Sequence, residues 1–292
     1  MRVSPAEYQV VAPSTLQEVV ALLARDPGIW LPIAGGTDVM VQYAAGKLAP
    51  RKWVSISGIP ELQSIEVASS EIQIGAGCTY TDIRNHKIIS DELPLLVRSA
   101  GWTGGIANQN RGTLGGNIAN ASPAGDSLPV LLAYGAELLL ISTRGERRVP
   151  YNGFHTGYKK SVLAPDELIR AVCIPRNFAE YSCYAKKVGA REAQAISKVF
   201  LAALGRLSNG KITDIRLAAG SVAPIPTRLA RTENVLRGHA ITESLVETCR
   251  RAVADEIHPI DDIRSTAKYR TAVLANLAAE FLTGLATARI SS

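Results

Sequence analysis

Apolar and polar positions along the first half of the chain follow two different periods, which predicts short strands mixed with helices. Helical spacing over residues 14–25 comes from four apolar positions, Leu16, Val19, Val20 and Leu23. Ser14 or Thr15 can cap this helix, and Glu18 lies at the distance that a capping box requires. Short apolar runs with the composition of strands lie at 30–34, 53–56 and 72–75.

The pattern changes near Pro175, where Pro175-Arg176-Asn177 interrupts it. Antiparallel strands are predicted beyond it at 184–187, 199–206 and 212–218, and helices at 242–256 and 267–285. Asn209-Gly210, between the last two strands, is typical of a hairpin turn. Strands followed by helices indicate an α+β domain. We therefore expect two domains, residues 1–175 and 176–292.

Two glycine pairs follow apolar segments, in Ala34-Gly35-Gly36-Thr37-Asp38 and in Thr113-Leu114-Gly115-Gly116-Asn117. A glycine pair lets the backbone approach a ligand closely and permits turns that align successive N–H groups. The neighbouring hydroxyl, carboxylate and amide side chains can bind a polyol. Neither segment matches the single-loop fingerprints G-x-G-x-x-G or G-x-x-x-x-G-K-S/T. The sequence therefore predicts a dinucleotide held by two separate loops.

Residues 101–126 are rich in glycine and asparagine and show no helical or strand period longer than a few residues. A long structureless stretch inside a compact domain is usually functional or disordered. Apolar Leu114, Ile118 and Pro123 are spread through it, which argues against disorder, and a helix-like segment follows at 128–132. We interpret the stretch as an ordered ligand-binding loop.

Composition excludes several classes of protein. The chain has 292 residues, 47% hydrophobic and 20% charged, as in a globular protein. Its net charge of +6 is spread along the chain and aromatic residues make up only 5%, so no nucleic-acid interface is predicted, and the mild basicity favours a polyanionic cofactor or an acidic partner. The longest apolar run, 128–141, is too short to span a bilayer, and the N-terminus lacks a signal-peptide pattern. We expect a cytoplasmic protein without membrane association.

Metal ligands are not clustered in the sequence. The cysteines, Cys78, Cys173, Cys183 and Cys249, form no C-x-x-C, and the four histidines are equally dispersed. Zinc and iron–sulfur sites usually show clustered ligands. No metal site is predicted, and the cysteines are expected to be reduced and mostly buried. His155 has no evident carboxylate or nucleophile partner and is expected to be structural.

Several motifs together resemble the FAD-binding medium subunit of the molybdenum hydroxylases, the xanthine dehydrogenase family. The similarity covers almost the whole chain, and its segments stand in the right order. They are 34–38, 111–118, 121–129, 153–160, 166–168, 187–191, 195–199, 222–226 and 269–270. The segment 106–110 differs from the family's usual form, and the inserted cysteine cluster of one reductase branch is missing.

The resemblance implies a two-lobed FAD-binding fold of the vanillyl-alcohol-oxidase (PCMH) type, followed by a smaller three-stranded α+β domain. The FAD pyrophosphate would be wrapped by Pro32, Ile33, Ala34, Gly35, Gly36, Thr37, Asp38 and Val39. The phosphates and ribityl would be held from the opposite side by Thr113, Leu114, Gly115, Gly116 and Asn117. Asp126 would hydrogen-bond the ribityl chain, and Ile169 would pack on the adenine or the ring system. Lys187 would approach the isoalloxazine, where a cation favours the anionic reduced flavin.

The resemblance also implies an electron-transfer subunit, closest to those of purine or xanthine dehydrogenases. Electrons would arrive singly from an iron–sulfur small subunit, collect on FAD and leave to NAD⁺ or another acceptor. This chain has neither clustered cysteines for 2Fe–2S centres nor the length for a molybdopterin domain. Those cofactors would therefore reside on partners, an iron–sulfur small subunit and a molybdopterin-binding large subunit.

Other interpretations stay open at this point. The chain could be a stand-alone FAD-dependent oxidoreductase with its own substrate site, although no base or covalent flavin link is evident. It could also be a scaffold that lost the cofactor, against which the intact glycine pairs argue. The glycine pairs could be simple turns, Asp38 and Asp126 could be helix caps, and Lys187 could be a solvated surface lysine. Tyr158 and Lys159 fit either a flavin or nicotinamide site or a solvated loop.

Overall fold

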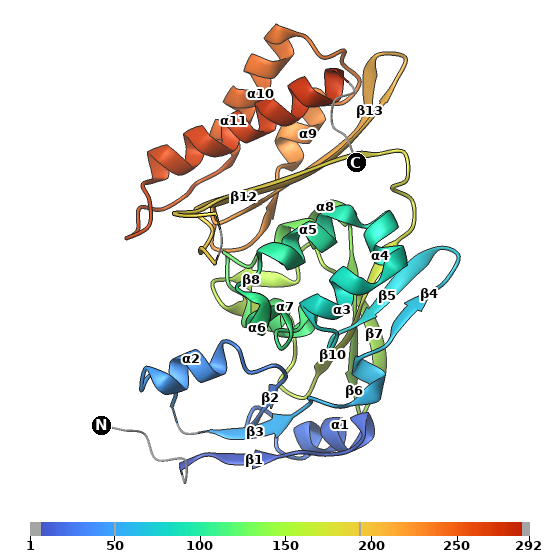
Figure 1. The fold of residues 1–292 in the computed structure, drawn as a ribbon, viewed down its shortest axis with the longest axis vertical. Coiled ribbons are helices and arrows are strands. Elements are labelled where there is room, and N and C mark those ends of the chain that lie inside the picture. Colours follow the sequence, from blue (N-terminus) through green and yellow to red (C-terminus); the bar gives the residue numbers. More distant parts are fainter. Residues whose placement is uncertain (1–6, 50, 193, 288–292) are drawn as a thin grey trace.

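The computed structural model describes residues 7–49, 51–192 and 194–287. Three parts follow one another along its long axis: a small N-terminal lobe, a middle lobe and a C-terminal domain (Figure 1). None of the helices within these residues has the length and apolar character needed to cross a membrane.

The N-terminal lobe is a parallel three-stranded sheet in the order β1 (Gln9–Val11), β3 (Lys52–Ser55) and β2 (Trp30–Ile33). It carries α1 (Leu16–Arg25), α2 (Val39–Ala44) and the short 3₁₀ helix η2 (Pro60–Leu62). The predicted capping box is confirmed: Thr15 Oγ1 accepts the Glu18 N–H, and the Glu18 carboxylate accepts the Thr15 N–H. The apolar face of α1 is buried, which fixes this helix on the lobe.

The middle lobe is a five-stranded antiparallel sheet covered by helices. Its strand order is β4 (Ile65–Val67), β5 (Glu71–Gly75), β10 (Leu168–Pro175), β6 (Glu137–Ser142) and β7 (Gly145–Pro150). The helices include α3 (Tyr80–Asn85), α4 (Lys87–Glu92), α5 (Pro94–Trp102) and α8 (Ser127–Tyr134). A separate pair of short strands, β8 (His155–Gly157) and β9 (Lys160–Ser161), follows β7 in the chain.

The glycine-rich stretch, which we predicted to be an ordered loop, includes two short helices. It contains α6 (Ile106–Gln109) and α7 (Leu114–Asn120). Thr113 Oγ1 caps α7 by accepting the Gly116 N–H at 3.1 Å. An ideal Cβ on Gly115 would lie 2.5 Å from the Ala76 Cβ, so this glycine permits close packing. Glycine has a low helix propensity. The spacing of apolar residues therefore did not predict α7, although the helix forms.

The C-terminal domain is an antiparallel sheet with three helices. The three predicted strands are β11 (Ser182–Val188), β12 (Val199–Ser208) and β13 (Lys211–Gly220), and a two-residue edge strand, β14 (Thr227–Arg228), extends them. The helices are α9 (Ala230–Leu236), α10 (Glu243–Glu256) and α11 (Ala267–Ala286). Asn209 and Gly210 have φ of 51° and 71°, the positive values of the predicted two-residue hairpin turn.

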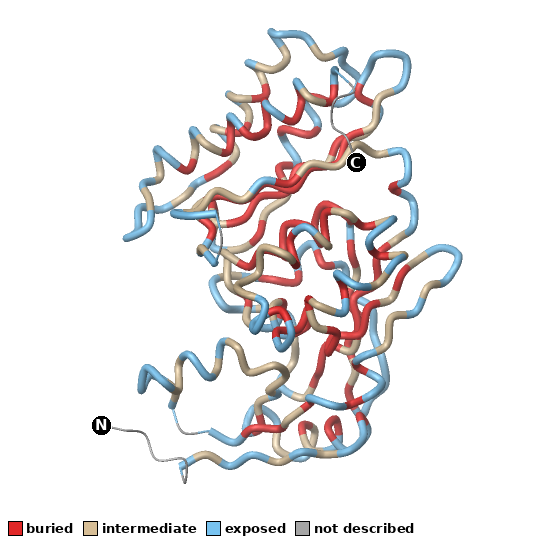
Figure 2. Tube along the Cα trace, in the orientation of Figure 1, coloured by how far each residue is buried: buried red, intermediate tan, exposed pale blue. Residues whose placement is uncertain are grey.

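The C-terminal sheet is buried on both faces (Figure 2). Leu201 and Ala203 of β12 belong to the core formed with α10 and α11. Phe200 and Ala202, on the opposite face, belong to the core formed with α5 and α8 of the middle lobe. A strand buried on both faces reads as a continuous apolar run. The sheet is thus a layer shared by two cores, which fixes the C-terminal domain against the middle lobe.

Candidate functional site

The two glycine segments meet in space. An ideal Cβ on Gly35 would lie 1.6 Å from the carbonyl oxygen of Arg111, two residues before the second segment. Gly36 has φ of +72°, a conformation that side chains with a Cβ rarely adopt. The loop of the N-terminal lobe therefore crosses the middle lobe with no side chain between the two backbones.

A cleft of about 440 Å³ opens beside this crossing. One wall is the stretch 31–39 with Gln42, which includes every residue predicted around the first glycine pair. The facing wall includes three predicted residues, Thr113, Gly116 and Asn117. The lining also includes Thr103, Gly112, Ala119 and Asn120, which belong to the stretch 101–126 predicted as a ligand-binding loop. Lining residues that the sequence did not suggest are Leu31, Gln42, Trp53 and Tyr80.

The two walls differ in their hydrogen bonding. Within the described part of the chain, the N–H groups of Gly35, Gly36 and Thr37 have no hydrogen-bond acceptor. By contrast, the N–H of Gly115 donates to the Ala76 carbonyl at 2.9 Å, and the N–H of Gly116 is used by the α7 cap. The first loop therefore offers backbone donors to a ligand, whereas the second presents a closely packed wall.

Five predicted residues do not line the cleft. Asp126 and Lys187 are two of them and are described below, and the other three are part of the packing behind the wall. Leu114 is fully buried, and Gly115 packs on Ala76. Ile169 lies on β10 opposite Leu140 of β6 and is buried in the middle-lobe core. The structure therefore places these residues behind the wall, where they support it.

Asp126 and Lys187 form a buried ion pair. Lys187 Nζ, from β11, donates to Asp126 Oδ2 at 2.6 Å and to the Trp102 carbonyl at 3.1 Å, and each charged side chain is only 8% exposed. Lys187 is therefore not a solvated surface lysine. Asp126 Oδ1 is buried and has no partner among the described residues. Burial raises the pKa of Asp126 to about 6, although Lys187 opposes the shift.

Neither aspartate caps its helix. Asp126 stands before α8 and Asp38 before α2, but neither side chain makes a capping hydrogen bond. The Asp38 carboxylate instead accepts from Gln42 Nε2 at 2.5 Å, on the wall of the cleft. The structure therefore excludes helix capping, the alternative role that the sequence left open for both aspartates.

Tyr80 is a residue that sequence reasoning missed. It lines the cleft, is 2% exposed, and its hydroxyl has no partner among the described residues. Burial raises the pKa of Tyr80, the nearby Ser127 and Thr103 hydroxyls lower it, and the Asp126 charge raises it. No sequence signal distinguishes this tyrosine, because it simply follows the cap of α3. Two buried oxygens without partners, Tyr80 Oη and Asp126 Oδ1, thus lie in one region.

His155, which was expected to be structural, is buried, and its Nε2 lies 2.9 Å from the Ile118 carbonyl oxygen of α7. Burial lowers the pKa of His155. Lys159 Nζ donates to Asn120 Oδ1 at 3.2 Å on the rim of the cleft, whereas Tyr158 is 63% exposed. The four cysteines are free, and three are buried, as predicted. Among the described residues, no cluster of histidine, cysteine or carboxylate side chains could hold a metal ion.

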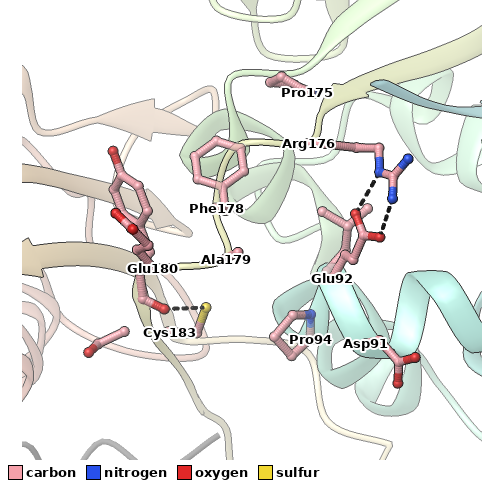
Figure 3. A pocket seen from close by; sticks show the side chains of 12 residues that line it. Asp91, Glu92, Pro94, Pro175, Arg176, Phe178, Ala179, Glu180 and Cys183 are labelled. Carbon is pink, nitrogen blue, oxygen red and sulfur yellow. Dashed lines mark hydrogen bonds and ion pairs between the residues drawn. The ribbon is translucent and has the colours of Figure 1, made fainter. Parts of the chain in front are cut away.

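A second cavity, of about 460 Å³, lies where the chain leaves the middle lobe (Figure 3). Arg176 faces Glu92 across it, with two guanidinium–carboxylate hydrogen bonds of 2.8 and 2.6 Å. Neither glycine segment lines this cavity. The cleft beside the glycine crossing, which both glycine segments line, is therefore the candidate site.

Known proteins share this architecture. The family model described as the FAD binding domain in molybdopterin dehydrogenase matches residues 6–177, and that of the CO dehydrogenase flavoprotein C-terminal domain matches 184–285. The chain is 34% identical over 259 residues to the putative xanthine dehydrogenase FAD-binding subunit of Escherichia coli strain K12, covering 88% of each. It is 30% identical over 270 residues to the glyceraldehyde dehydrogenase medium chain of Sulfolobus acidocaldarius, covering 92% of this chain and 95% of that one.

A solved structure agrees with these relatives. Carbon monoxide dehydrogenase from Hydrogenophaga pseudoflava matches with a TM-score of 0.92 and 29% identity, over 99% of this chain and 100% of that chain. The fold and the relatives agree with the resemblance in the sequence. The chain belongs to the FAD-binding medium subunits of the molybdenum hydroxylase family, which are flavoprotein oxidoreductase subunits.

Proposed function

We propose that this chain binds FAD in the cleft beside the glycine crossing and carries electrons through it within a larger assembly. The observation that carries the proposal is the set of unpaired N–H groups at Gly35, Gly36 and Thr37 in that cleft. Consecutive N–H groups without acceptors suit a pyrophosphate, because they offer it charge-assisted hydrogen bonds at little cost of reorganisation.

The remaining groups of the site fit the rest of the cofactor. Asp126 Oδ1 and Tyr80 Oη are buried without partners, and both can hydrogen-bond the hydroxyls of a ribityl chain. Gly116 leaves the facing wall free of a side chain. Lys187 does not line the cleft and supplies a buried cation next to Asp126, which already holds it.

Bound FAD supplies the redox chemistry, because a flavin handles both single-electron and two-electron transfers. The chain's residues bind and orient it: the first loop holds the phosphates, and Asp126 and Tyr80 hold the polyol. Lys187 favours negative charge nearby. We further propose an iron–sulfur small subunit as electron donor, a molybdopterin-binding large subunit as the site of substrate oxidation, and NAD⁺ or another acceptor. The domain limits, 1–175 and 176–292, and a cytoplasmic location stay predictions from the sequence.

The direct test is a visible absorption spectrum of the purified chain, taken before and after acid precipitation, with FAD added if the protein is colourless. We expect flavin bands that move to the supernatant, because the proposed contacts are non-covalent. Bands that stay in the pellet would indicate a covalent flavin and a stand-alone oxidase. Absence of flavin, together with no uptake of added FAD, would refute the proposal.

Gly116→Val is expected to abolish FAD binding, because its Cβ would lie 2.9 Å from Thr113 Oγ1, so the branched side chain must displace the α7 cap in the cleft wall. Flavin occupancy after gel filtration measures the effect. Gly157→Val is the matched control, since the nearest atom to a Cβ there is Lys160 Cδ at 3.9 Å. Full flavin occupancy in Gly116→Val would show that the cofactor does not pass this wall.

FAD affinity is expected to fall as the pH drops below about 6, where Asp126 takes up a proton in the folded chain. The ionised carboxylate keeps Oδ1 as a hydrogen-bond acceptor, whereas the protonated form can carry its proton on that oxygen. The affinity for FAD can therefore fall by up to about tenfold per pH unit. Titration of flavin fluorescence at several pH values measures this. Asp126→Asn should bind FAD more weakly near neutrality and without that pH dependence. An identical profile in both proteins would contradict the role of Asp126.

A further inference from the structure

Helix α8 is held by the C-terminal domain at both of its ends. All eight of its residues are buried, and the helix lies between the middle-lobe sheet and the C-terminal sheet. Asp126 stands directly before its first residue, and Gly135 ends it with φ of +63°. Any displacement of this helix therefore moves Asp126.

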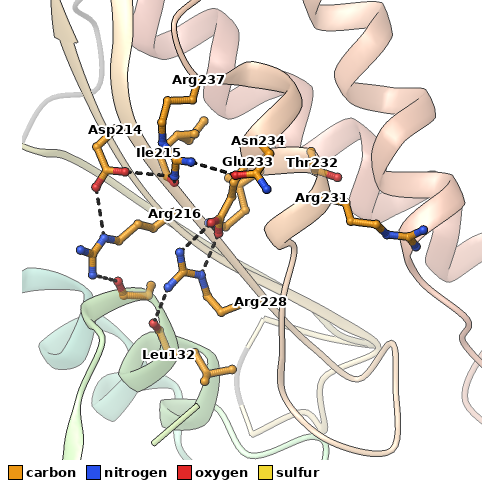
Figure 4. Close-up of polar contacts among 12 residues, drawn as sticks. Leu132, Asp214, Ile215, Arg216, Arg228, Arg231, Thr232, Glu233, Asn234 and Arg237 are labelled. Carbon is orange, nitrogen blue, oxygen red and sulfur yellow. Dashed lines mark hydrogen bonds and ion pairs between the residues drawn. The ribbon is translucent and has the colours of Figure 1, made fainter. Parts of the chain in front are cut away.

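Two arginines of the C-terminal sheet hold the last turn of α8 (Figure 4). Arg228 Nη1, from β14, donates to the Leu132 carbonyl at 3.2 Å, and Arg216 Nη1, from β13, donates to the Ala133 carbonyl at 3.4 Å. The Leu132 carbonyl also accepts the Gly135 N–H at 3.0 Å. Cations near the carbonyls of a last helical turn are stabilising. An ideal Cβ on Gly135 would lie 3.0 Å from Arg216 Nη1, so the glycine admits this guanidinium.

Each guanidinium is itself fixed. Arg228 makes two hydrogen bonds of 2.7 Å to Glu233, whose side chain is 4% exposed and also accepts the Leu217 N–H at 2.7 Å. Arg216 donates to Asp214 at 3.2 Å and lies 5.0 Å from the centre of the Phe178 ring. The arginines are therefore rigid supports rather than flexible surface side chains.

The other end of α8 is held by the same sheet. Lys187 of β11 reaches Asp126, and the N–H of Ser221, just after β13, donates to the Pro123 carbonyl at 2.8 Å. The positions of Lys187, Arg216 and Arg228 relative to each other are fixed by the sheet that carries all three. The separation of Asp126 from Lys187 therefore depends on how α8 sits against that sheet.

We propose that Arg216 and Arg228 are positioning residues for the flavin site, holding α8 so that Asp126 meets Lys187 and keeps Oδ1 available to FAD. The inference rests on the proposed binding of FAD at Asp126. This positioning role of Arg216 and Arg228 can be distinguished from a general contribution to stability. The arginines affect FAD only through the Asp126–Lys187 pair, so their effect vanishes when that pair is absent.

A double-mutant cycle on the full chain tests this, with FAD affinity measured by flavin fluorescence. Arg216→Gln removes the bond to Ala133 while Asp214 keeps Tyr181 and Arg237 as donors. We expect FAD binding about fivefold weaker in the native background. With Asp126→Asn and Lys187→Gln already present, the same change should cost less than about twofold. Equal losses in both backgrounds, or no loss in the native one, would overturn the inference.

Arg206→Gln is the matched control. Arg206 lies on the same sheet, over the Tyr181 ring and beside Glu180, and its hydrogen bonds do not involve α8. Its loss should leave FAD affinity unchanged. If Arg216→Gln does not fold, the combined Arg228→Gln and Glu233→Gln change replaces it in the cycle and leaves no buried carboxylate unpaired. A native chain that binds no FAD would refute the proposed function itself. That result differs from equal losses in both backgrounds, or no loss in the native one, which overturn only this inference.

Discussion

Gly35→Ala is expected to abolish FAD binding and to lower the free energy of unfolding by about 3 kcal/mol. The new Cβ would lie 1.6 Å from the Arg111 carbonyl oxygen and 2.4 Å from its carbon. Both are backbone atoms and a methyl group has no alternative rotamer, so the two segments must separate. Separation carries the free N–H groups of the first loop away from the facing wall and opens the contact between the lobes.

Urea unfolding and flavin fluorescence measure the two effects of Gly35→Ala independently. Gly157→Ala is the control, because its Cβ would meet only ordinary contacts. If Gly35→Ala retained native stability and native FAD affinity, the loop crossing would not have the geometry described above. Loss of stability with unchanged FAD affinity would place the cofactor elsewhere.

Lys187→Met is expected to lower the free energy of unfolding by about 3 to 5 kcal/mol near neutral pH, because it leaves the Asp126 carboxylate buried without its cation. The loss depends on pH. A carboxyl whose folded pKa lies above its unfolded value contributes most stability below the unfolded pKa, and that contribution is lost as the pH rises through the folded value. Burial already raises the pKa of Asp126, and removing Lys187 raises it further. The variant should therefore lose less stability near pH 5 than near pH 8.

Denaturant unfolding at both pH values measures the effect of Lys187→Met. Lys186→Met is the control, since Lys186 pairs with Glu280 on the surface and both side chains are 50% exposed. That change should cost less than about 1 kcal/mol. Adding Asp126→Asn to Lys187→Met should recover stability at neutral pH, because no charge is then buried alone. A Lys187→Met variant as stable as Lys186→Met would contradict the buried ion pair.

Elements with a local signal could be predicted from the sequence. The α1 helix followed from its apolar spacing and its capping box, and the turn at Asn209-Gly210 followed from the need for positive φ. The loop at 34–38 was assigned to the ligand because its residue types suit a phosphate and a polyol, and the structure places it on the cleft. In each case the cause lies within a few residues of the chain.

Other features depend on contacts between distant segments. The α7 helix escaped prediction because its glycines serve contact with Ala76, which no local pattern reveals. Tyr80 lines the cleft only because it lies next to residues of 31–42, 103 and 112–120, which are distant from one another in the sequence. Ile169, Leu114 and Gly115 belong to the wall behind the cleft, and whether a residue of a motif faces the ligand or supports the wall depends on the packing of the sheet.

The contact between Gly35 and Arg111 also determines the order in which the holoprotein can form. It joins two lobes whose segments are far apart in the chain, and such non-local contacts form late in folding because their loop-closure entropy is large. The cleft does not exist until both lobes have docked. With FAD bound in this cleft as proposed, the cofactor would enter only after both lobes have docked, and the lifetime of the empty folded form would set the time available for loading.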